Sequence, residues 1–442
     1  MKPSFGEAAK FWFLLGWINF GGPAGQIALM HDELVEKRRW IDSPRFLHAL
    51  NYCMLLPGPE AMQLATYVGW LLHGVRGGVL AGVLFILPGA LLMLGLSFVY
   101  SNWGEVSWIR GIFYGLGPAV IAVVASAVFR IARKNLRHPA LVTLAVLAFV
   151  AIFFFQAPFP AVVLGAGLVG FVGQRFRPAW FRSSGHASDS AAAAVVHAPH
   201  TQPSAMRTLR VVLTHVALWA APIVALGLTR GWRDPFVTLS LFFSAAAMVT
   251  FGGAYAVLSY VAQAAVSKYG WIGPHDMTVG MGLAESTPGP LILVLQFVGY
   301  LAGWNHPPLG WSPLGSALMT TFLTLWMTFV PCFLWILAGA PYVERLRGRP
   351  ALDGALTALT AAVVGVILNL AVWLALRVLF RVVSVHQVGP LTLNVPSWST
   401  LDVFALVLAL VGLVALTRFK VHLIPVLLIS GAAGLVAVLI RS

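Results

Sequence analysis

Two Pro-Gly-Pro tripeptides stand in apolar surroundings at residues 57–59 and 288–290. Proline lacks a backbone N–H and disfavours helical geometry in the residue before it, so neither tripeptide can continue a helix. A new helix can begin at Pro59 or Pro290, because the first helical position tolerates proline. The first N–H groups of such a helix have no partner within it and carry the positive end of its dipole. The chemistry that these segments predict is the binding of an anion.

The tripeptides belong to a longer pattern that occurs twice. Phe-Gly-Gly, Trp-Ile and Pro-Gly-Pro follow one another at the same spacing in both copies, and each is offset by 231 residues from its counterpart. The pairs are 20–22 with 251–253, 40–41 with 271–272, and 57–59 with 288–290. Duplicated halves with Gly and Pro breaks inside apolar segments are typical of membrane transporters.

The composition predicts an integral membrane protein. Of the 442 residues, 59% are hydrophobic and only 10% are charged, whereas a soluble domain carries about 25% charged residues. Apolar runs long enough to cross a ~30 Å hydrocarbon layer recur along the chain. These runs are 9–30, 77–100, 107–129, 235–264, 313–340, 354–376 and 421–440. Since the alternation of a β-barrel is absent, the predicted fold class is an all-α polytopic membrane protein.

The chain divides into two homologous halves joined by a polar segment. We expect a first repeat over 1–174, a Ser/Ala/His-rich linker over 175–208, and a second repeat over 209–442 that begins with an additional span at about 209–228. Contrasts in loop charge between the copies favour opposite insertion, whereas counting spans with each Pro-Gly-Pro hairpin re-entering the membrane gives parallel copies. We adopt the antiparallel interpretation, with broken, re-entrant helices at Pro-Gly-Pro.

The distribution of charge bears on location and partners. Lys and Arg outnumber Asp and Glu by 28 to 14, and they gather in short loop clusters such as 37–39 and 345–349. This is the positive-inside pattern of a multi-pass protein of the inner (plasma) membrane, with the lipid bilayer rather than nucleic acid as partner. Cys53 and Cys332 both lie in apolar stretches, which argues against a disulfide framework. We expect no metal and no cofactor.

Two acidic residues in apolar surroundings flank the tripeptides. Glu60 follows the first one directly, and Glu285 stands three residues before the second. A carboxylate in hydrocarbon costs a few kcal/mol, so each is a functional candidate. An ionised carboxylate would repel an anion, so each is either a protonatable group or a helix cap. Gln63 and the Ser286-Thr287 pair offer neutral donors at the breaks.

The Gly-Gly segments complete the candidate site. They allow close backbone approach to a ligand, or simply close helix packing, and Gln26 follows the first of them. The substrate-binding and transport candidates are therefore Gly21, Gly22, Gln26, Pro57, Gly58, Pro59, Glu60, Gln63, Gly252, Gly253, Glu285, Ser286, Thr287, Pro288, Gly289 and Pro290. His31-Asp32-Glu33 is set aside as a metal site, because adjacent helical positions cannot all face one point.

These motifs resemble those of the chromate transporter family over nearly the full chain. The resemblance rests on Phe20-Gly-Gly-Pro23, Leu56-Pro-Gly-Pro59, Leu87-Pro88-Gly89, Thr250-Phe-Gly-Gly253 and Glu285-Ser-Thr-Pro-Gly-Pro290. It implies export of chromate, a tetrahedral dianion, from the cytoplasm, together with resistance to that ion and a fold of oppositely oriented halves. The copies differ, since Ala254-Tyr255 replaces Pro23-Ala24 and Cys332 replaces Gly89. Two identical binding sites are therefore not expected.

Other functions stay open at this point. A carrier of sulfate, molybdate or another oxyanion would need the same features, because these ions differ little in size and charge. A membrane-embedded enzyme is disfavoured, since no nucleophile–base pair and no metal-ligand spacing is present. A sensor would be expected to carry a soluble domain. The oligomeric state also stays open, with a homo-oligomer as one alternative.

Overall fold

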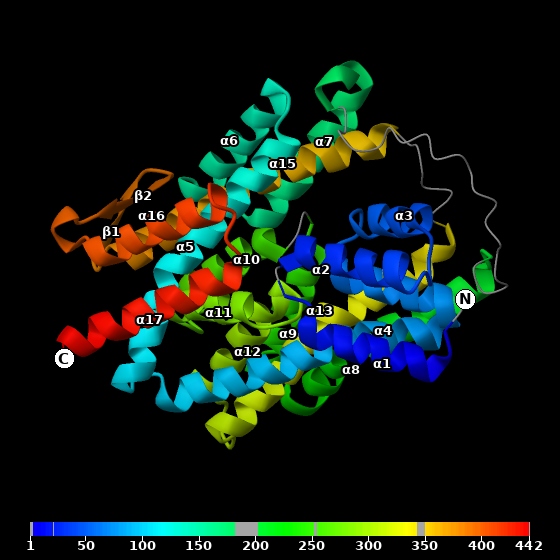
Figure 1. The fold of residues 1–442 in the computed structure, drawn as a ribbon, viewed down its shortest axis with the longest axis horizontal. Coiled ribbons are helices and arrows are strands. Elements are labelled where there is room, and N and C mark those ends of the chain that lie inside the picture. The colour runs from blue at the N-terminus through cyan, green and yellow to red at the C-terminus, as the bar shows by residue number, and fades with distance from the viewer. Residues whose placement is uncertain (1–2, 21, 182–201, 252–253, 343–349, 442) are drawn as a thin grey trace. The chain divides into compact units, whose positions relative to one another are not determined.

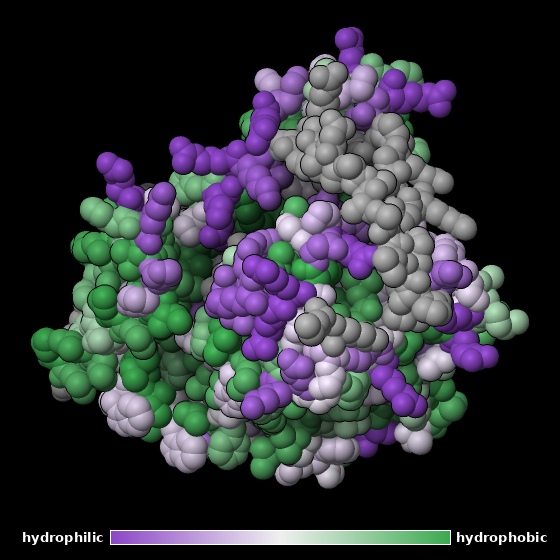
Figure 2. All heavy atoms as spheres, turned by 45° about the vertical axis from the view of Figure 1, so that its right-hand side comes forward, coloured by the Kyte–Doolittle hydropathy of each residue, from purple (hydrophilic) through white to green (hydrophobic). Residues whose placement is uncertain are grey.

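The computed structural model of the chain describes residues 3–20, 22–181, 202–251, 254–342 and 350–441, and it is mostly helical (Figure 1). Within these residues, seven helices are long and apolar enough to cross a membrane. Hydrophobic side chains cover large parts of the face shown in Figure 2. A multi-pass helical membrane protein is therefore what the structure supports, as the composition predicted.

Within the described residues, the first copy contains seven α-helices and two short helices of other types. They are α1 (Phe5–Ile18), α2 (Gly22–His31), the π-helix η1 (Asp32–Lys37), α3 (Ser43–Cys53), α4 (Glu60–Trp103, which doubles back as two helices), α5 (Ser107–Asn135), α6 (Pro139–Phe153), α7 (Phe159–Phe176) and the 3₁₀ helix η2 (Pro178–Phe181). The linker predicted at 175–208 lies largely outside the described residues.

The second copy repeats this order after one additional helix. That helix, α8 (Ala205–Arg230), covers the stretch in which an extra span is expected. The rest are α9 (Pro235–Met248), α10 (Ala254–Ala262), the π-helix η4 (Gln263–Lys268), α11 (Pro274–Ser286), η5 (Leu291–Leu293), α12 (Val294–Asn305), α13 (Pro313–Gly339), η6 (Ala340–Tyr342), α15 (Pro350–Leu379), η7 (Trp398–Thr400), α16 (Val403–Thr417) and α17 (Leu423–Arg441).

The likeness of the copies extends to single hydrogen bonds. Both have a π-helical turn at the same place, η1 and η4, and a Trp-Ile pair after it. The Trp40 N–H donates to the carbonyl of Leu34 (2.9 Å), and the Trp271 N–H donates to that of Ala265 (2.8 Å). Because π-helical turns are rare, their recurrence at one offset supports the duplication that the sequence predicted.

The helices that follow the two Pro-Gly-Pro breaks are short and fold back. Helix α4 leaves helical geometry at His73 and Gly74, and Gly69 there packs on Gly77. In the second copy α12 has only 12 residues and packs on α13. At about 1.5 Å per residue such helices reach roughly 20 Å, less than the ~30 Å of a hydrocarbon layer. None of them can cross a membrane alone.

The chain forms two compact units, and neither coincides with a sequence repeat. The first unit takes the described residues of Met1–Ser97, Ser188–Ala254 and Thr287–Arg347, and the second takes those of Phe98–Ala187, Tyr255–Ser286 and Gly348–Ser442. Each unit thus contains segments of both copies. In the first unit α13 packs on α8, α9 and α12.

Packing in the second unit is exchanged between the copies. Helix α5 of the first copy packs on α16 and α17 of the second, and α15 of the second copy packs on α6 and α7 of the first. Glycines allow the helix backbones to approach, as they commonly do in membranes. Gly115 lies against the Ser430 carbonyl of α17, and Gly170 lies against the Gly354 carbonyl of α15. A side chain at either position would collide with backbone.

One hairpin departs from the predicted all-α fold. Strands β1 (Val383–Val388) and β2 (Leu391–Pro396) pair antiparallel after α15. The three β-branched valines in Val-Ser-Val-His-Gln-Val favour a strand, and Gly389-Pro390 forms the turn. The all-α expectation is corrected here, because a long hydropathy window does not register a six-residue alternation.

Substitution of Gly170 tests the exchanged packing. We expect Gly170→Val to destabilise the protein by about 1–3 kcal/mol, because an added side chain meets the Gly354 backbone and the Ala358 methyl group. Thermal unfolding in detergent, followed by tryptophan fluorescence, measures the loss. Gly165→Val on the same helix is the control, since a Cβ there meets no atom within 4 Å. Equal melting temperatures for the two variants would contradict the packing.

Candidate functional site at the helix breaks

The first Pro-Gly-Pro break is buried in the first unit and bonded to the second copy. The Gly58 N–H donates to the main-chain carbonyl of Thr250 (2.8 Å). Gln63, fully buried one turn into α4, donates from Nε2 to the Pro57 carbonyl (2.7 Å). Gly58 has a φ of +127°, which side-chain-bearing residues rarely adopt. The break is therefore an ordered turn rather than a loose kink.

The second break has a corresponding arrangement with the first copy. The Gly289 N–H donates to Oδ1 of the buried Asn19 (2.5 Å), and lies 3.5 Å from the Asn19 carbonyl. Gln26, also buried, donates from Nε2 to the carbonyls of Gly289 (2.6 Å) and Asn19 (2.9 Å). Gly289 has a φ of +108°. The main-chain N–H and the main-chain carbonyl of Gly289 are thus both bonded within the protein.

These contacts are reciprocal. Asn19 and Thr250 occupy the same place in the two copies, directly before Phe-Gly-Gly, and Gly58 and Gly289 are likewise equivalent. Each Pro-Gly-Pro therefore binds the residue before the Gly-Gly break of the other copy. Backbone that is broken inside a bilayer must be satisfied by protein or water. Here the two copies satisfy each other.

A second reciprocal contact involves the residues that follow the later prolines, Gly89 after Pro88 and Cys332 after Pro331. Gly89 approaches the Pro288 carbonyl so closely that a Cβ would collide with it. Its counterpart Cys332 places its sulfur about 2.7 Å from where a Cβ on Gly58 would stand. The sequence difference between Gly89 and Cys332 thus makes the two breaks unequal in their packing.

The hydrogen bonds limit what this conformation can offer an anion. The N–H groups of both central glycines already donate to the other copy. The side-chain amides of Gln26 and Gln63 donate to carbonyls, and their buried Oε1 atoms have no hydrogen-bond partner within the described ranges. An anion bound at the two Pro-Gly-Pro breaks would therefore have to displace these hydrogen bonds.

The two candidate carboxylates have different surroundings. Glu60, half-buried, is the first residue of α4 in the first unit. Glu285 is buried near the end of α11 in the second unit, and the Tyr255 hydroxyl donates to its Oε1 (2.5 Å). The first copy has Ala24 and Met54 at these two places. This polar pair is therefore a property of the second copy.

The remaining predicted site residues are divided between the two compact units. Pro57, Pro59, Thr287, Pro288 and Pro290 are buried in the first unit, with the residues described above. Ser286 lies in the second unit and donates to the carbonyl of Leu283 (2.9 Å). Gly22 begins α2. Three of the predicted glycines lie outside the described residues, namely Gly21, Gly252 and Gly253.

Asn19 is a site residue that the sequence reasoning missed. It directly precedes the repeated Phe-Gly-Gly motif, and the equivalent residue of the second copy is Thr250. Because the two residues differ, a search for residues that are identical in both copies does not find Asn19. The available signal is a polar side chain beside a glycine break in an apolar run, which is costly unless it is bonded.

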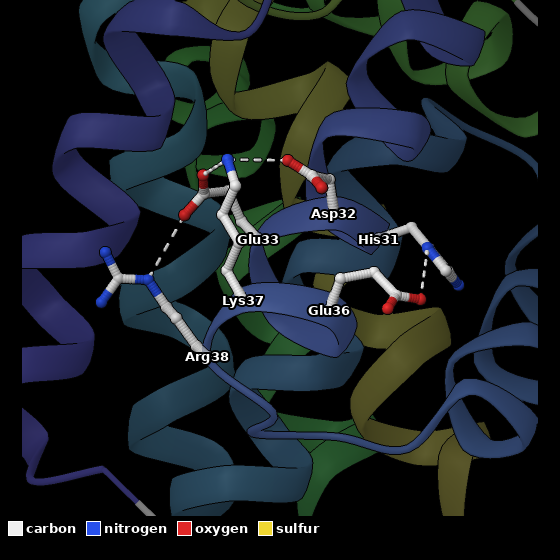
Figure 3. A network of polar contacts seen from close by, with 6 residues as sticks. All are labelled: His31, Asp32, Glu33, Glu36, Lys37 and Arg38. Carbon is white, nitrogen blue, oxygen red and sulfur yellow. Dashed lines mark hydrogen bonds and ion pairs between the residues drawn. The ribbon is translucent and has the colours of Figure 1, made fainter.

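The side chains of His31, Asp32 and Glu33 form ion pairs with neighbouring residues and do not converge on one point as metal ligands would. Lys37 Nζ lies 2.8 Å from oxygens of both Asp32 and Glu33, and Arg38 Nε lies 3.5 Å from Glu33 (Figure 3). His31 is 4.0 Å from Glu36 on another side of the turn. Hydrogen bonds to Asp32 and Glu33 raise the pKa of Lys37. The acidic groups are thus engaged by cations of their own segment.

Duplicated broken helices, buried in a multi-pass helical protein, are the architecture of a secondary transporter. The sequence model of the family described as Chromate transporter matches residues 6–171 and 237–435, and the chain belongs to this family. The predicted resemblance is confirmed, and the two matched segments correspond to the two copies.

Full-length relatives agree with the family assignment. The chain is 32% identical over 428 residues to a chromate transport protein of Pseudomonas aeruginosa, covering 95% of this chain and 89% of the relative. It is 28% identical over 435 residues to that of Cupriavidus metallidurans, covering 98% and 92%. A probable chromate transport protein of Synechococcus elongatus is 25% identical over 366 residues, covering 82% and 83%. These relatives are named as transport proteins, not enzymes. No solved structure gives a significant match.

Asn19 and Thr250 provide a matched test of the reciprocal bonds. We expect Asn19→Ala to lower the free energy of unfolding by about 1–3 kcal/mol, because the buried Gly289 N–H loses its side-chain acceptor. Thr250→Val should cost less, since the bond to Gly58 uses the main-chain carbonyl and the hydroxyl donates to the Ala246 carbonyl of the preceding helix α9. Thermal unfolding in detergent compares them. A larger loss for Thr250→Val would contradict the assigned bonds.

Proposed function

We propose that the protein exports chromate from the cytoplasm across the inner membrane by alternating access, and thereby confers resistance to chromate. The observation that carries this proposal is the family match over both copies, with full-length relatives named for chromate transport. The buried helix breaks support it, because the paired interruption of helices is typical of secondary transporters that carry ions.

The electrical energy of the membrane favours this direction. An interior-negative potential is worth ~2.3 kcal/mol per charge per 100 mV, so a dianion that leaves the cell gains roughly 4.6 kcal/mol per 100 mV. Import would have to carry more than two positive charges with each ion to become electrically favourable. Export is the direction that needs the least coupling machinery.

We assign the conformational change of alternating access to the hydrogen bonds that each Pro-Gly-Pro break makes with the other copy. In the described conformation, the Gly58 and Gly289 amides donate to Thr250 and Asn19 of the other copy. Movement of one copy against the other would break these bonds and release donors at two helix starts, where an anion is favoured. The short helices on either side support the interpretation of the breaks as re-entrant, and the contrast in loop charge between the copies supports antiparallel halves.

The two carboxylates are placed to carry protons rather than to bind substrate. Glu285 accepts a hydrogen bond from Tyr255 and is buried, whereas Glu60 stands directly after the first break. Transfer of a proton to a buried carboxylate removes a costly charge and so couples its protonation to conformation. Sulfate is the second candidate substrate, since it has the shape and charge of chromate.

Transport by inverted vesicles tests the export itself. We expect vesicles that contain the protein to accumulate labelled chromate, faster when the imposed potential makes the lumen positive, because the dianion then moves down the field. Vesicles without the protein are the control. Sulfate in the same assay decides between the two substrates. Absence of movement of either ion from purified protein in liposomes would refute the proposed function.

Neutral replacements of the acids test their role. We expect Glu285→Gln and Glu60→Gln to preserve folding and to flatten the dependence of the chromate transport rate on pH, because each removes a group that can exchange a proton. The rate is measured across a pH series in the vesicle assay. Glu105→Gln, at an exposed loop position, is the control. An unchanged profile would remove the residue concerned from any coupling role.

A further inference from the structure

A polar cleft lies within the second unit, outside the helix breaks. It has a volume of about 310 Å³ and is formed by the end of α6, by α10 and η4, by the last turns of α15, and by the β-hairpin. This is about ten times the ~30 Å³ that a water molecule occupies in the liquid. The cleft has room for a small ion together with part of its hydration shell.

The hairpin presents one face to this cleft. Val385 pairs with Asn394 and Gln387 with Thr392 in the strand register, so the four side chains share a face, and all four line the cleft. The Thr392 N–H donates to the Phe154 carbonyl (2.7 Å), which fastens the hairpin to the end of α6. The hairpin that hydropathy did not predict is thus a wall of the cleft.

The lining is rich in neutral hydrogen-bonding groups. Asn369 of α15 donates from Nδ2 to the buried Ser259 hydroxyl of α10 (3.0 Å), and Gln263 of η4 donates to Gln156 (2.6 Å). These bonds hold three elements of the wall in a fixed geometry. Among the described residues that line the cleft, none is Asp or Glu. A cation would find no counter-charge here.

Arg377 supplies the charge of the cleft. It stands in the last turn of α15, is partly buried, and lines the cleft. Its guanidinium makes no hydrogen bond or ion pair with any residue that the structure describes. An arginine at a helix end commonly anchors the helix in the headgroup layer. A guanidinium inside a cleft of amides and hydroxyls instead has the fork of donors that recognises a planar pair of anionic oxygens.

We propose that this cleft is a binding site for a tetrahedral oxyanion, with Arg377 as the charged ligand and the amides of Asn369, Gln387 and Asn394 as neutral donors. The site is separate from the helix breaks, and its assignment to the transported ion rests on the proposed function. A cationic, carboxylate-free cleft raises the local concentration of a dianion before it enters the transport path.

Direct binding to the purified full-length protein tests the site. Labelled sulfate and chromate serve as probes in detergent without added lipid. We expect Arg377→Gln to weaken the binding of both ions about tenfold or more, since a charge-assisted pair is lost, and Arg377→Lys to restore part of it. Arg381→Gln, an exposed charge outside the cleft, should change binding by less than about twofold.

A second pair of variants guards against misfolding as an explanation. Gln387→Glu introduces a negative charge on the cleft face of β1, whereas Ser384→Glu introduces the same charge on its other face. We expect only the first to weaken binding of the ions, with equal melting temperatures for both. Equal effects of the two, or full binding by Arg377→Gln, would overturn the proposal.

Two further outcomes separate the alternatives. If anionic phosphatidylglycerol displaces the labelled ions at a far lower concentration than unlabelled sulfate does, the cleft holds a lipid phosphate and the proposed site for the transported ion is overturned. If wild-type protein binds the oxyanions through Arg377 but moves neither ion in liposomes, the cleft stands and the proposed transport function fails. Normal transport with unaltered KM in Arg377→Gln would instead overturn the assignment of the cleft to the transported ion, and leave the proposed transport function standing.

Discussion

The exchange of backbone hydrogen bonds between the two helix breaks is the constraint on which the first unit depends. A peptide that leaves helical geometry inside a bilayer cannot turn to water, so its polar groups must be satisfied by protein. Gly58 and Gly289 meet this demand by bonding to Thr250 and Asn19, each in the opposite copy. Neither copy could keep its break without the other, which explains why the compact units combine segments of both repeats.

The same exchange governs the second unit through packing rather than hydrogen bonding. Helix α5 lies on the last two helices of the second copy, and α15 lies on the last two of the first. Glycines such as Gly115 and Gly170 bring the backbones together. Small residues at matched positions let van der Waals contact replace the hydrophobic driving force that is missing between helices in lipid. Duplication has thus produced two copies whose segments are exchanged between the compact units, instead of two halves that fold separately.

The sequence predicts what depends on local pattern and leaves open what depends on pairing. The glycine and proline breaks, the duplication and most of the long helices follow from composition and spacing, and the family follows from the resemblance of the motifs. The partner of each break does not, because the periodicity of Phe-Gly-Gly and Pro-Gly-Pro is the same whether a copy binds itself or its twin. Asn19 could not be predicted from the repeat, since its counterpart is Thr250. The cleft around Arg377 is lined by residues that range from position 152 to position 394. Only tertiary structure brings such residues together.

The exchange of segments has a consequence for biosynthesis. When the ribosome has completed α7, the helices of the first copy have been made, but α9, α13, α16 and α17 do not yet exist. The Gly58 amide of the nascent protein therefore has no partner until Thr250 has been made, and α5 lacks its final neighbours until α16 and α17 have been made. Insertion of the first copy into the bilayer must therefore precede tertiary assembly. A prematurely terminated product would expose unpacked helix surfaces to quality-control proteases.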